Sequence, residues 1–300
     1  MKKKTYLIAL MAMALTLGSC SDNENGIGGE TSKNITVSTI IDNMTRVATD
    51  ANGGQTFEEG DEISVYAWTG APTVAPETSE RVVNNAINKL TNGSWVSTPQ
   101  MLWKNNRDKH YFIGVYPTAV ISDLSAGEYT FDVNKQTESD LLVAVNKDGL
   151  SYNADAQQTV PLTFTHVMAK LAVNLTYKNQ WGGIPTVEKV VVGNAAKEAT
   201  INYLTKVVTP STTAKEDFSL PEITENTKYV SVIIPQEDVK QLTIVIGGKN
   251  FVYDNGTPFK LESGKITTVN LEVGRDEIKL GDVKITNWED GSTFSGEALN

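Results

Sequence analysis

Residues 166–177 alternate between apolar and polar side chains, and this alternation is the clearest structural signal in the chain. Every second position is apolar: Val167, Ala169, Leu171, Val173, Leu175 and Tyr177. The polar residues between them include His166, Lys170, Asn174 and Thr176. Side chains along a β-strand point alternately to the two faces of the sheet. The pattern therefore predicts a strand with one face buried in a β-sheet core.

Much of the remaining chain shows short runs of β-branched and aromatic residues separated by polar turns, which is typical of all-β proteins. We expect strands near residues 34–41, 62–68, 111–117, 141–145, 187–192, 200–204, 229–234, 242–246, 251–253, 265–273 and 277–288. Residues 82–90 have helix-like apolar spacing and are compatible with one short helix. Asp254-Asn255-Gly256 predicts a hairpin turn. The predicted fold class is all-β.

The last expected strand changes its alternation part of the way along. Its apolar residues are Ile278, Leu280, Val283, Ile285 and Trp288. The spacing slips at Gly281-Asp282, which predicts either a β-bulge or two consecutive short strands.

The first 19 residues have the layout of a secretory signal peptide. Lys2, Lys3 and Lys4 precede an apolar run at residues 6–17, which is too short to span a membrane. The run ends in Leu-Gly-Ser-Cys, the form of a bacterial lipobox, and Cys20 is the only cysteine in the chain. We expect Cys20 to carry acyl chains such as palmitate and to hold the protein at the outer membrane. The alternative is an ordinary signal peptide followed by a chance cysteine.

The composition after the signal suggests a tether and two domains. Residues 20–33 are rich in Gly, Ser, Asn and acidic residues and predict a flexible tether. The remaining length suits two domains, which we place at residues 34–162 and 163–300. Without residues 1–19 the chain has 23 basic and 36 acidic residues, a net charge of −13. Such a charge disfavours nucleic acid as a partner.

No motif in the sequence indicates catalysis, a cofactor or a metal site. A Gly-x-Ser-x-Gly nucleophile elbow and a Walker loop are both absent. The two histidines, His110 and His166, are more consistent with strand positions than with a zinc site or a catalytic set. Acidic residues between 58 and 62 are compatible with a calcium loop, although a solvated turn before a strand explains them better. We expect a protein that is not an enzyme.

The five tryptophans allow two interpretations. Aromatic faces can stack on sugar rings, so they could form a glycan-binding platform. However, they are scattered over both halves of the sequence, which favours packing in a core or between domains. They are Trp68, Trp95, Trp103, Trp181 and Trp288.

Several of these features together resemble the fimbrillin family, the subunits of type V pili. The resemblance rests on the lipobox, on Thr45-Arg46 after a first strand, and on a closing strand that ends at Trp288. It also rests on two internal motifs, Glu-Gly-Asp-Glu-Ile-Ser-Val-Tyr at residues 59–66 and Phe-Thr-His-Val-Met-Ala-Lys-Leu at residues 164–171. The similarity extends from Cys20 to the C-terminus.

The resemblance implies two transthyretin-like β-sandwich domains in tandem and export as a lipoprotein precursor. It also implies that an arginine-specific protease cuts between Arg46 and Val47 and removes a first strand that carries Ile35, Val37 and Ile41. A strand from another copy or a related pilin subunit would then fill the groove in the assembled fimbrium. That donor strand corresponds to Ile278, Leu280, Val283, Ile285 and Trp288 of the incoming subunit.

The residues themselves are consistent with this maturation. Arginine is scarce, and Arg46 is placed so that one cut would free the whole lipidated segment. Loss of a strand exposes unpaired backbone groups and an apolar groove, which favours strand addition. Two alternatives stay open: Arg46 could be an ordinary residue at a strand end, and the protein could be a non-polymerising surface lipoprotein that binds glycans.

Overall fold

The computed structural model describes residues 33–42, 56–153, 158–254 and 256–288. These residues form strands β1–β19 and three short 3-10 helices, η1 (Thr78–Glu80), η2 (Gln136–Ser139) and η3 (Asn179–Trp181), and they contain no α-helix. The predicted all-β class is confirmed.

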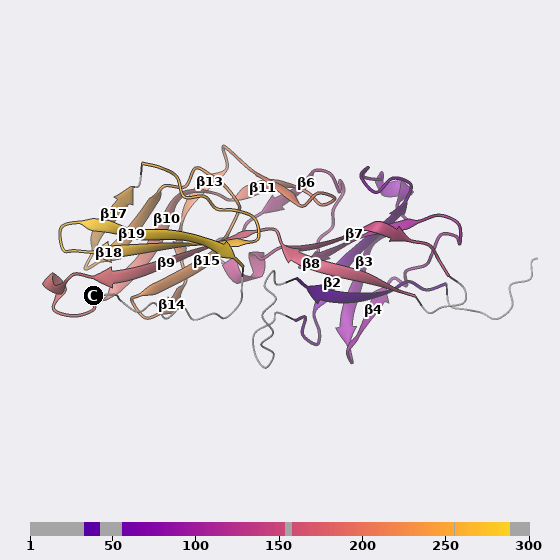
Figure 1. Ribbon diagram of the computed structural model, residues 1–300, viewed down its shortest axis with the longest axis horizontal. Helices are drawn as coiled ribbons and strands as arrows, with labels where there is room; N and C mark the ends of the chain where they lie inside the picture. Colours follow the sequence, from indigo (N-terminus) through magenta and orange to yellow (C-terminus); the bar gives the residue numbers. More distant parts are fainter. Residues whose placement is uncertain (1–32, 43–55, 154–157, 255, 289–300) are drawn as a thin grey trace, which may run out of the picture.

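A seven-stranded sheet lies toward one end of the elongated molecule (Figure 1). Its strand order is β1-β8-β7-β5-β2-β3-β4. The strands are β1 (Thr36–Ile41), β2 (Glu62–Thr69), β3 (Val83–Thr91), β4 (Ser94–Thr98), β5 (His110–Tyr116), β7 (Leu142–Leu150) and β8 (Thr159–His166).

Three smaller sheets contain the remaining strands. One has the order β14-β15-β9-β18-β19, with β14 (Glu222–Thr224), β15 (Lys228–Ile233), β9 (Ala169–Tyr177), β18 (Lys265–Val273) and β19 (Ile278–Asn287). A second has the order β13-β10-β16-β17, with β13 (Lys215–Leu220), β10 (Val187–Ala196), β16 (Gln241–Ile246) and β17 (Lys249–Asp254). The third joins β6 (Gly127–Thr130) to β11 (Glu198–Asn202) and β12 (Val207–Pro210).

The alternating segment at residues 166–177 behaves as predicted over most of its length. Strand β9 begins at Ala169, and the apolar positions from Ala169 to Leu175 are buried. His166 instead ends β8, so the chain passes from the seven-stranded sheet to the five-stranded sheet at Val167-Met168. Both of these crossover residues are buried, and Val167 N donates to Leu141 O at 3.0 Å.

The helix considered for residues 82–90 is wrong, because this segment forms β3. Val65 of β2 faces Ala86, whereas Ala67 faces Val83, so β3 contains a β-bulge at this point. Asn85 in the bulge has a left-handed backbone with φ of 57°. The bulge separates two buried positions by three residues instead of two, which explains the helix-like spacing.

The hairpin turn predicted at Asp254-Asn255-Gly256 is also wrong. Strand β17 ends at Asp254 and pairs with β16, whereas the next strand, β18, lies in a different sheet. The hairpin in this region is instead the β16–β17 turn at Gly247-Gly248, where both glycines have positive φ values of 58° and 72°.

The slip predicted near the C-terminus is a β-bulge within a single strand. Val269 of β18 faces Val283, and Leu271 faces Leu280, so Gly281 and Asp282 together oppose one residue. The extra residue keeps the two apolar side chains of β19 on the same face of the sheet.

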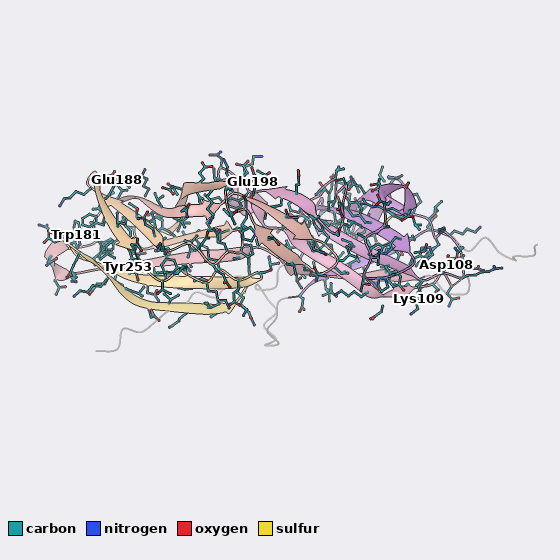
Figure 2. All side chains as sticks on the ribbon, turned by 90° about the horizontal axis from the view of Figure 1, so that it is seen from above. Asp108, Lys109, Trp181, Glu188, Glu198 and Tyr253 are labelled. Atoms are coloured by element: carbon teal, nitrogen blue, oxygen red, sulfur yellow. The ribbon has the colours of Figure 1, made fainter. Side chains whose placement is uncertain are left out.

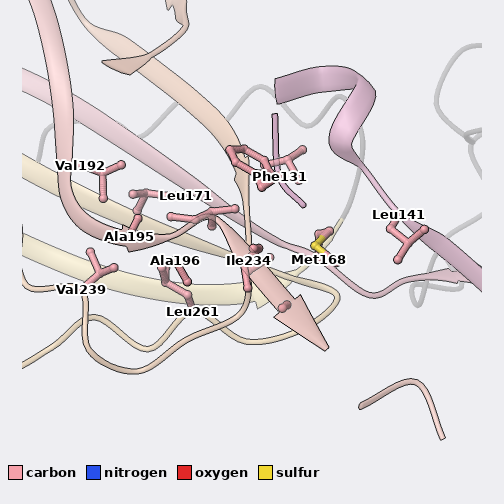
Figure 3. Packing of buried hydrophobic residues seen from close by; sticks show 14 of the residues in the cluster. Phe131, Leu141, Met168, Leu171, Val192, Ala195, Ala196, Ile234, Val239 and Leu261 are labelled. Atoms are coloured by element: carbon pink, nitrogen blue, oxygen red, sulfur yellow. The ribbon is translucent and has the colours of Figure 1, made fainter. Parts of the chain in front are cut away.

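Two hydrophobic clusters hold the sheets together. The smaller cluster packs on one face of the seven-stranded sheet and includes Ile63, Val65, Phe112 and Phe164. The larger cluster begins on the opposite face and continues through residues such as Leu141, Met168 and Leu171 into the C-terminal sheets (Figure 3). Strands β2 and β5 are therefore buried on both faces.

A close contact in the smaller cluster gives a prediction for stability. A Cβ added to Gly114 of β5 would lie 2.6 Å from Cζ of Phe164 on β8. We expect Gly114→Ala to lower the free energy of unfolding by about 1–3 kcal/mol through overpacking. Urea denaturation measures this loss. In a Phe164→Leu background, where the ring edge is gone, the added loss should be smaller; an equal loss would show that this contact is not the cause.

Candidate functional site

Strand β1 lies at one edge of the seven-stranded sheet and pairs with β8 in parallel. The register runs from Thr36 opposite Thr159 to Ile41 opposite Phe164. Beyond the strand, Asp42 N donates to Phe164 O at 2.8 Å. The first strand predicted from the sequence therefore exists, and β8 supplies one wall of the groove that holds it.

The other side of β1 contacts the opposite end of the same sheet. Ile35 N donates to Met101 O at 2.9 Å, and Trp103 N donates to Lys33 O at 3.0 Å. Farther along, Trp95 Nε1 on β4 donates to Thr39 Oγ1 at 3.0 Å. The two ends of the sheet thus meet at β1. Removing β1 would leave both of these neighbouring segments without their partner along the length of the strand.

The side chains of β1 divide sharply between core and solvent. Ile35 is 1% exposed and Val37 is 6% exposed, and both belong to the smaller cluster. Ile41 is half-buried against that cluster, whereas Ile40 is 64% exposed. Deep burial in the groove therefore requires apolar side chains mainly at positions 35 and 37.

Two clefts lie alongside β1. One of about 720 Å³ lies between β1 and the region of β4, and its lining includes Val37, Ile40, Leu90 and Trp95. The other, of about 280 Å³, has a more polar lining that includes Asn34, Trp95, Gln100, Tyr152 and Gln158. Trp95 lines both.

Phe57 covers the end of the groove and was not predicted from the sequence. Its ring packs edge-on against Trp95, Tyr116 and Phe164, with centroid distances of 5.3, 5.4 and 5.1 Å. Because Phe57 follows Arg46 in the chain, a cut after Arg46 would leave this cover in place.

Lys206 marks the C-terminal end of β1 and was also missed. It extends from the turn between β11 and β12, and its Nζ donates to Thr165 Oγ1 on β8 at 2.9 Å. Burial lowers the pKa of Lys206, nearby Lys147 lowers it further, and Asp42 acts in the opposite direction. Asp42 and Lys206 thus bond to neighbouring residues of β8, Phe164 and Thr165, which places an acid and a partly buried cation near the end of β1.

The predicted donor residues lie on β19, an edge strand of the five-stranded sheet. Leu280 and Val283 are each 37% exposed and Ile285 is 39% exposed. They lie opposite Leu271, Val269 and Thr267 of β18, which are buried. Ile278 and the other donor residues are not brought close to the β1 groove of the same chain by any strand pairing of the described residues.

Trp288 fixes the end of β19 against the segment where the chain changes sheets. Its ring stacks on His166 with a centroid distance of 4.1 Å and an interplanar angle of 6°. Lys170 Nζ lies 4.3 Å from the ring centroid, and Trp288 N donates to Gly264 O at 3.1 Å. His166 Nδ1 in turn lies 3.0 Å from Asp140.

Most of the tryptophans are buried, as the interpretation in terms of packing predicted. Trp68 and Trp288 are buried, and Trp103 packs edge-on against Phe112 at 5.8 Å and is itself buried. The largely buried Trp103 also lines the cleft of about 280 Å³ beside β1. Trp95 keeps a partly exposed ring.

The other candidate residues have local structural partners. His110 accepts a hydrogen bond from Lys104 N at 3.1 Å. In the acidic segment, Asp61 accepts one from Glu58 N at 2.7 Å, and Glu62 pairs with Lys89 at 3.0 Å. Within the described ranges, no group of three metal-ligating side chains gathers to form a metal site.

Three predicted residues, Cys20, Arg46 and Val47, lie outside the described residues. Of the other arginines, Arg81 is buried and donates to Ile121 O and Ser122 O at 2.6 Å each. Arg107 and Arg275 are exposed and lie at opposite ends of the molecule, near the labelled Asp108 and Trp181 (Figure 2). No helix in the described part of the chain is both long and apolar enough to cross a bilayer.

Comparison with known proteins identifies related sequences and folds. A family model described as fimbrillin-like matches residues 45–288. Among curated proteins, none matches significantly.

Three solved structures from Bacteroides species have a similar fold. A candidate cell adhesion protein from Bacteroides ovatus has a TM-score of 0.64 at 18% identity, covering 85% of this chain and 98% of the other. A second, from Bacteroides uniformis, has a TM-score of 0.61 at 18% identity, covering 78% and 93%. A fimbrial protein from Bacteroides vulgatus has a TM-score of 0.52 at 12% identity, covering 84% and 99%.

The division of β1 into buried and exposed positions gives a second prediction. We expect Ile35→Ala to lower the free energy of unfolding of the intact chain by about 2–5 kcal/mol, because it leaves a cavity in the smaller cluster. Ile40→Ala removes the same atoms from an exposed site and should change the free energy of unfolding by no more than about 0.5 kcal/mol. Urea denaturation of the two variants compares them directly. Equal effects would mean that β1 does not seal the core.

Proposed function

Because the chain belongs to the fimbrillin-like family, we propose that it is a structural subunit of a cell-surface pilus that also serves adhesion. The observation that carries this proposal is that β1 closes the seven-stranded sheet and buries Ile35 and Val37. A strand that lies at a sheet edge and covers an apolar core can be exchanged for a strand of another molecule. No catalytic or cofactor role is part of the proposal.

The proposed maturation begins with export as a lipoprotein. Cys20 is acylated and holds the precursor at the outer membrane, with its folded part at the cell surface. An arginine-specific protease then cuts between Arg46 and Val47. Arg46 lies in the sequence between Asp42, at the end of β1, and Phe57, which packs in the groove, so one cut separates β1 from the rest of the chain.

The open groove then accepts a strand from another copy or a related pilin subunit. Without β1, the backbone groups of β8 and of residues 101–103 lack their partners, and an apolar channel is exposed. A replacement strand regains about 1 kcal/mol net for each hydrogen bond and about 1.5–3 kcal/mol for each buried aliphatic side chain. The gross gain is on the order of 10 kcal/mol before the entropy of association.

We also propose two transthyretin-like β-sandwich domains in tandem, at residues 34–162 and 163–300. The sheet membership supports two domains, because the seven-stranded sheet uses strands up to β8 and the four- and five-stranded sheets use strands from β9 onward. Strand β8 continues to His166, so the change of sheets lies just after the proposed boundary. The exception is β6, which pairs with β11 and ties the two parts together.

A second candidate function has one observation in its favour. The cleft of about 280 Å³ beside β1 combines the aromatic rings of Trp95 and Tyr152 with the amides of Asn34, Gln100 and Gln158. Aromatic faces and planar amides are groups that suit a sugar ring. The chain could then act as a surface lipoprotein that binds glycans without polymerising.

The N-terminus of the mature protein tests the proposed maturation. We expect material sheared from cells to begin at Val47 and to run as a ladder on a denaturing gel without boiling, because inserted strands dissociate slowly. Arg46→Ala should block both the new N-terminus and the ladder. Arg81→Lys serves as the control, since this buried residue should not be a cleavage site. Sheared material that begins only at Cys20 would reject the maturation step.

Affinity electrophoresis in polysaccharide gels separates the two candidate functions. If the chain is a pilus subunit only, we expect the unpolymerised precursor to migrate unchanged in these gels, and Trp95→Ala to have no effect. A retardation of the wild type that Trp95→Ala abolishes would favour glycan binding. Ile40→Ala is the matched surface control, because this residue lies outside the polar cleft.

A further inference from the structure

The two clefts beside β1 have linings without charge. They share Thr36 and Trp95, so the larger cleft continues from the smaller one on the two sides of the indole. None of the described residues that line either cleft is acidic, basic or a histidine, although charged residues make up 21% of the chain. The linings combine aromatic rings with hydroxyl and amide groups instead. An uncharged polar ligand suits such walls better than an ion does.

One polar atom in the smaller cleft lacks a partner. Gln158 lines this cleft, and its Oε1 is buried without a hydrogen-bond partner among the described residues. Buried polar groups in folded proteins are almost always paired, so an unpaired one needs an explanation. An amide oxygen only accepts hydrogen bonds. The group that would complete the bonding at this point is therefore a donor such as a hydroxyl.

Strand β1 holds Trp95 in one orientation. Trp95 Nε1 donates to Thr39 Oγ1 at 3.0 Å, and the ring of Phe57 packs edge-on against the indole at 5.3 Å. The indole is only half-buried, so part of its surface stays available to a ligand. A ring that is already fixed loses little conformational entropy when a ligand packs on it. Trp95 is therefore a pre-organised apolar wall.

The other side of the smaller cleft is also attached to β1. Thr36 Oγ1 donates to the backbone oxygen of Gln158 at 3.4 Å. The ring of Tyr152, another lining residue, lies 6.2 Å from that of Trp103 at a tilt of 43°. The cleft thus places aromatic rings and an unpaired acceptor around one small space, with β1 as a shared support.

We propose that the cleft of about 280 Å³ binds one uncharged hexopyranose ring of a glycan. The apolar face of the sugar packs on Trp95, and a sugar hydroxyl donates to Gln158 Oε1. Thr39 is a positioning residue, because it acts on the sugar only through the indole. This inference rests on the second candidate function, glycan binding, and adds the sugar class, the accepting atom and a role for β1 in the site.

Size and charge separate this ligand from others. Small-molecule pockets commonly begin at about 300 Å³, so the cleft suits a single ring better than a long chain. An acyl chain would leave the amide of Gln158 without a donor. A uronic acid would bring a carboxylate to a lining without a cation, on a chain whose formal net charge is −10. A neutral hexose meets none of these penalties.

Titration of the uncut chain with simple sugars tests the ligand class. Isothermal titration calorimetry with D-glucose, D-galactose and D-mannose, each compared with its uronic acid, measures the preference. We expect at least one hexose to bind saturably and its uronic acid to bind at least about tenfold more weakly, because the carboxylate gains no partner. Equal binding of the acid, or no binding of any hexose, would overturn the proposal.

The role of Gln158 is tested by removing its acceptor. Gln158→Met keeps the length of the side chain, and we expect it to weaken hexose binding at least about tenfold through the lost hydrogen bond. The same change should not lower the thermal unfolding midpoint, because the acceptor has no partner within the protein. Gln241→Met, at an exposed position of β16, is the control. Wild-type affinity in Gln158→Met would contradict the assignment.

The positioning role of Thr39 has its own variants. Thr39→Val removes the acceptor of the indole N–H and should weaken binding at least about threefold, whereas Thr39→Ser keeps the hydroxyl and should bind as the wild type does. Thr163→Val, an exposed threonine of β8 that lines neither cleft, is the matched control. Equal affinities of the Val and Ser variants at position 39 would show that the hydrogen bond does not orient the site.

Hydrogen exchange locates the bound sugar. Because β1 supports both walls, a bound hexose should slow amide exchange in residues 35–41 of the uncut chain. Trp181 is the other partly exposed tryptophan and lies on η3, so Trp181→Ala should retain full binding. Loss of binding in Trp181→Ala, with unchanged exchange in β1, would place the sugar elsewhere and overturn the proposal.

Failure of this inference differs from failure of the functions on which it builds. If the uncut chain is not retarded in any polysaccharide gel and binds no hexose, glycan binding itself is wrong. If the chain is retarded, but Gln158→Met and Thr39→Val bind as tightly as the wild type, glycan binding is retained and this site is wrong. The proposed pilus subunit is tested separately, by the N-terminus of sheared material.

Discussion

The pairing of β1 with β8 is the interaction on which the rest of the N-terminal half depends. A β-sheet edge exposes backbone donors and acceptors and, when one face is apolar, an uncovered core as well. Here β1 lies between β8 on one side and residues 101–103, which follow β4, on the other, and its backbone bonds to both. The same contacts that stabilise the intact chain are the ones that a strand from another molecule could make.

In the proposed strand exchange, the C-terminal strand β19 is the counterpart of β1. Strand β19 has aliphatic side chains that its own sheet covers incompletely, and its pairing is interrupted by a bulge. Its end is held by the stacking of Trp288 on His166, at the segment where the chain passes from one set of sheets to the other. The intact chain thus keeps an edge strand whose aliphatic side chains are only partly covered.

Local sequence patterns predicted much of the fold but not its irregularities. Alternation predicted β9 and β18 because these strands pack one face on the core throughout. The same rule failed at residues 82–90, where the bulge at Asn85 imitates helical spacing. The short strand β6 escaped prediction because pairing with the distant β11, rather than its own composition, stabilises it. Phe57 and Lys206 were missed for a related reason, since only the tertiary fold brings them to the groove.

The identity of the strand beside β8 in the assembled form is the most direct test of this account. A cryo-electron microscopy map of the polymer formed after cleavage at Arg46 would show which side chains lie opposite residues 159–164. The account predicts that they belong to the C-terminal segment of a neighbouring copy and that residues 35–41 of the same chain are gone. A polymer in which Ile35 and Val37 still fill the groove would contradict it.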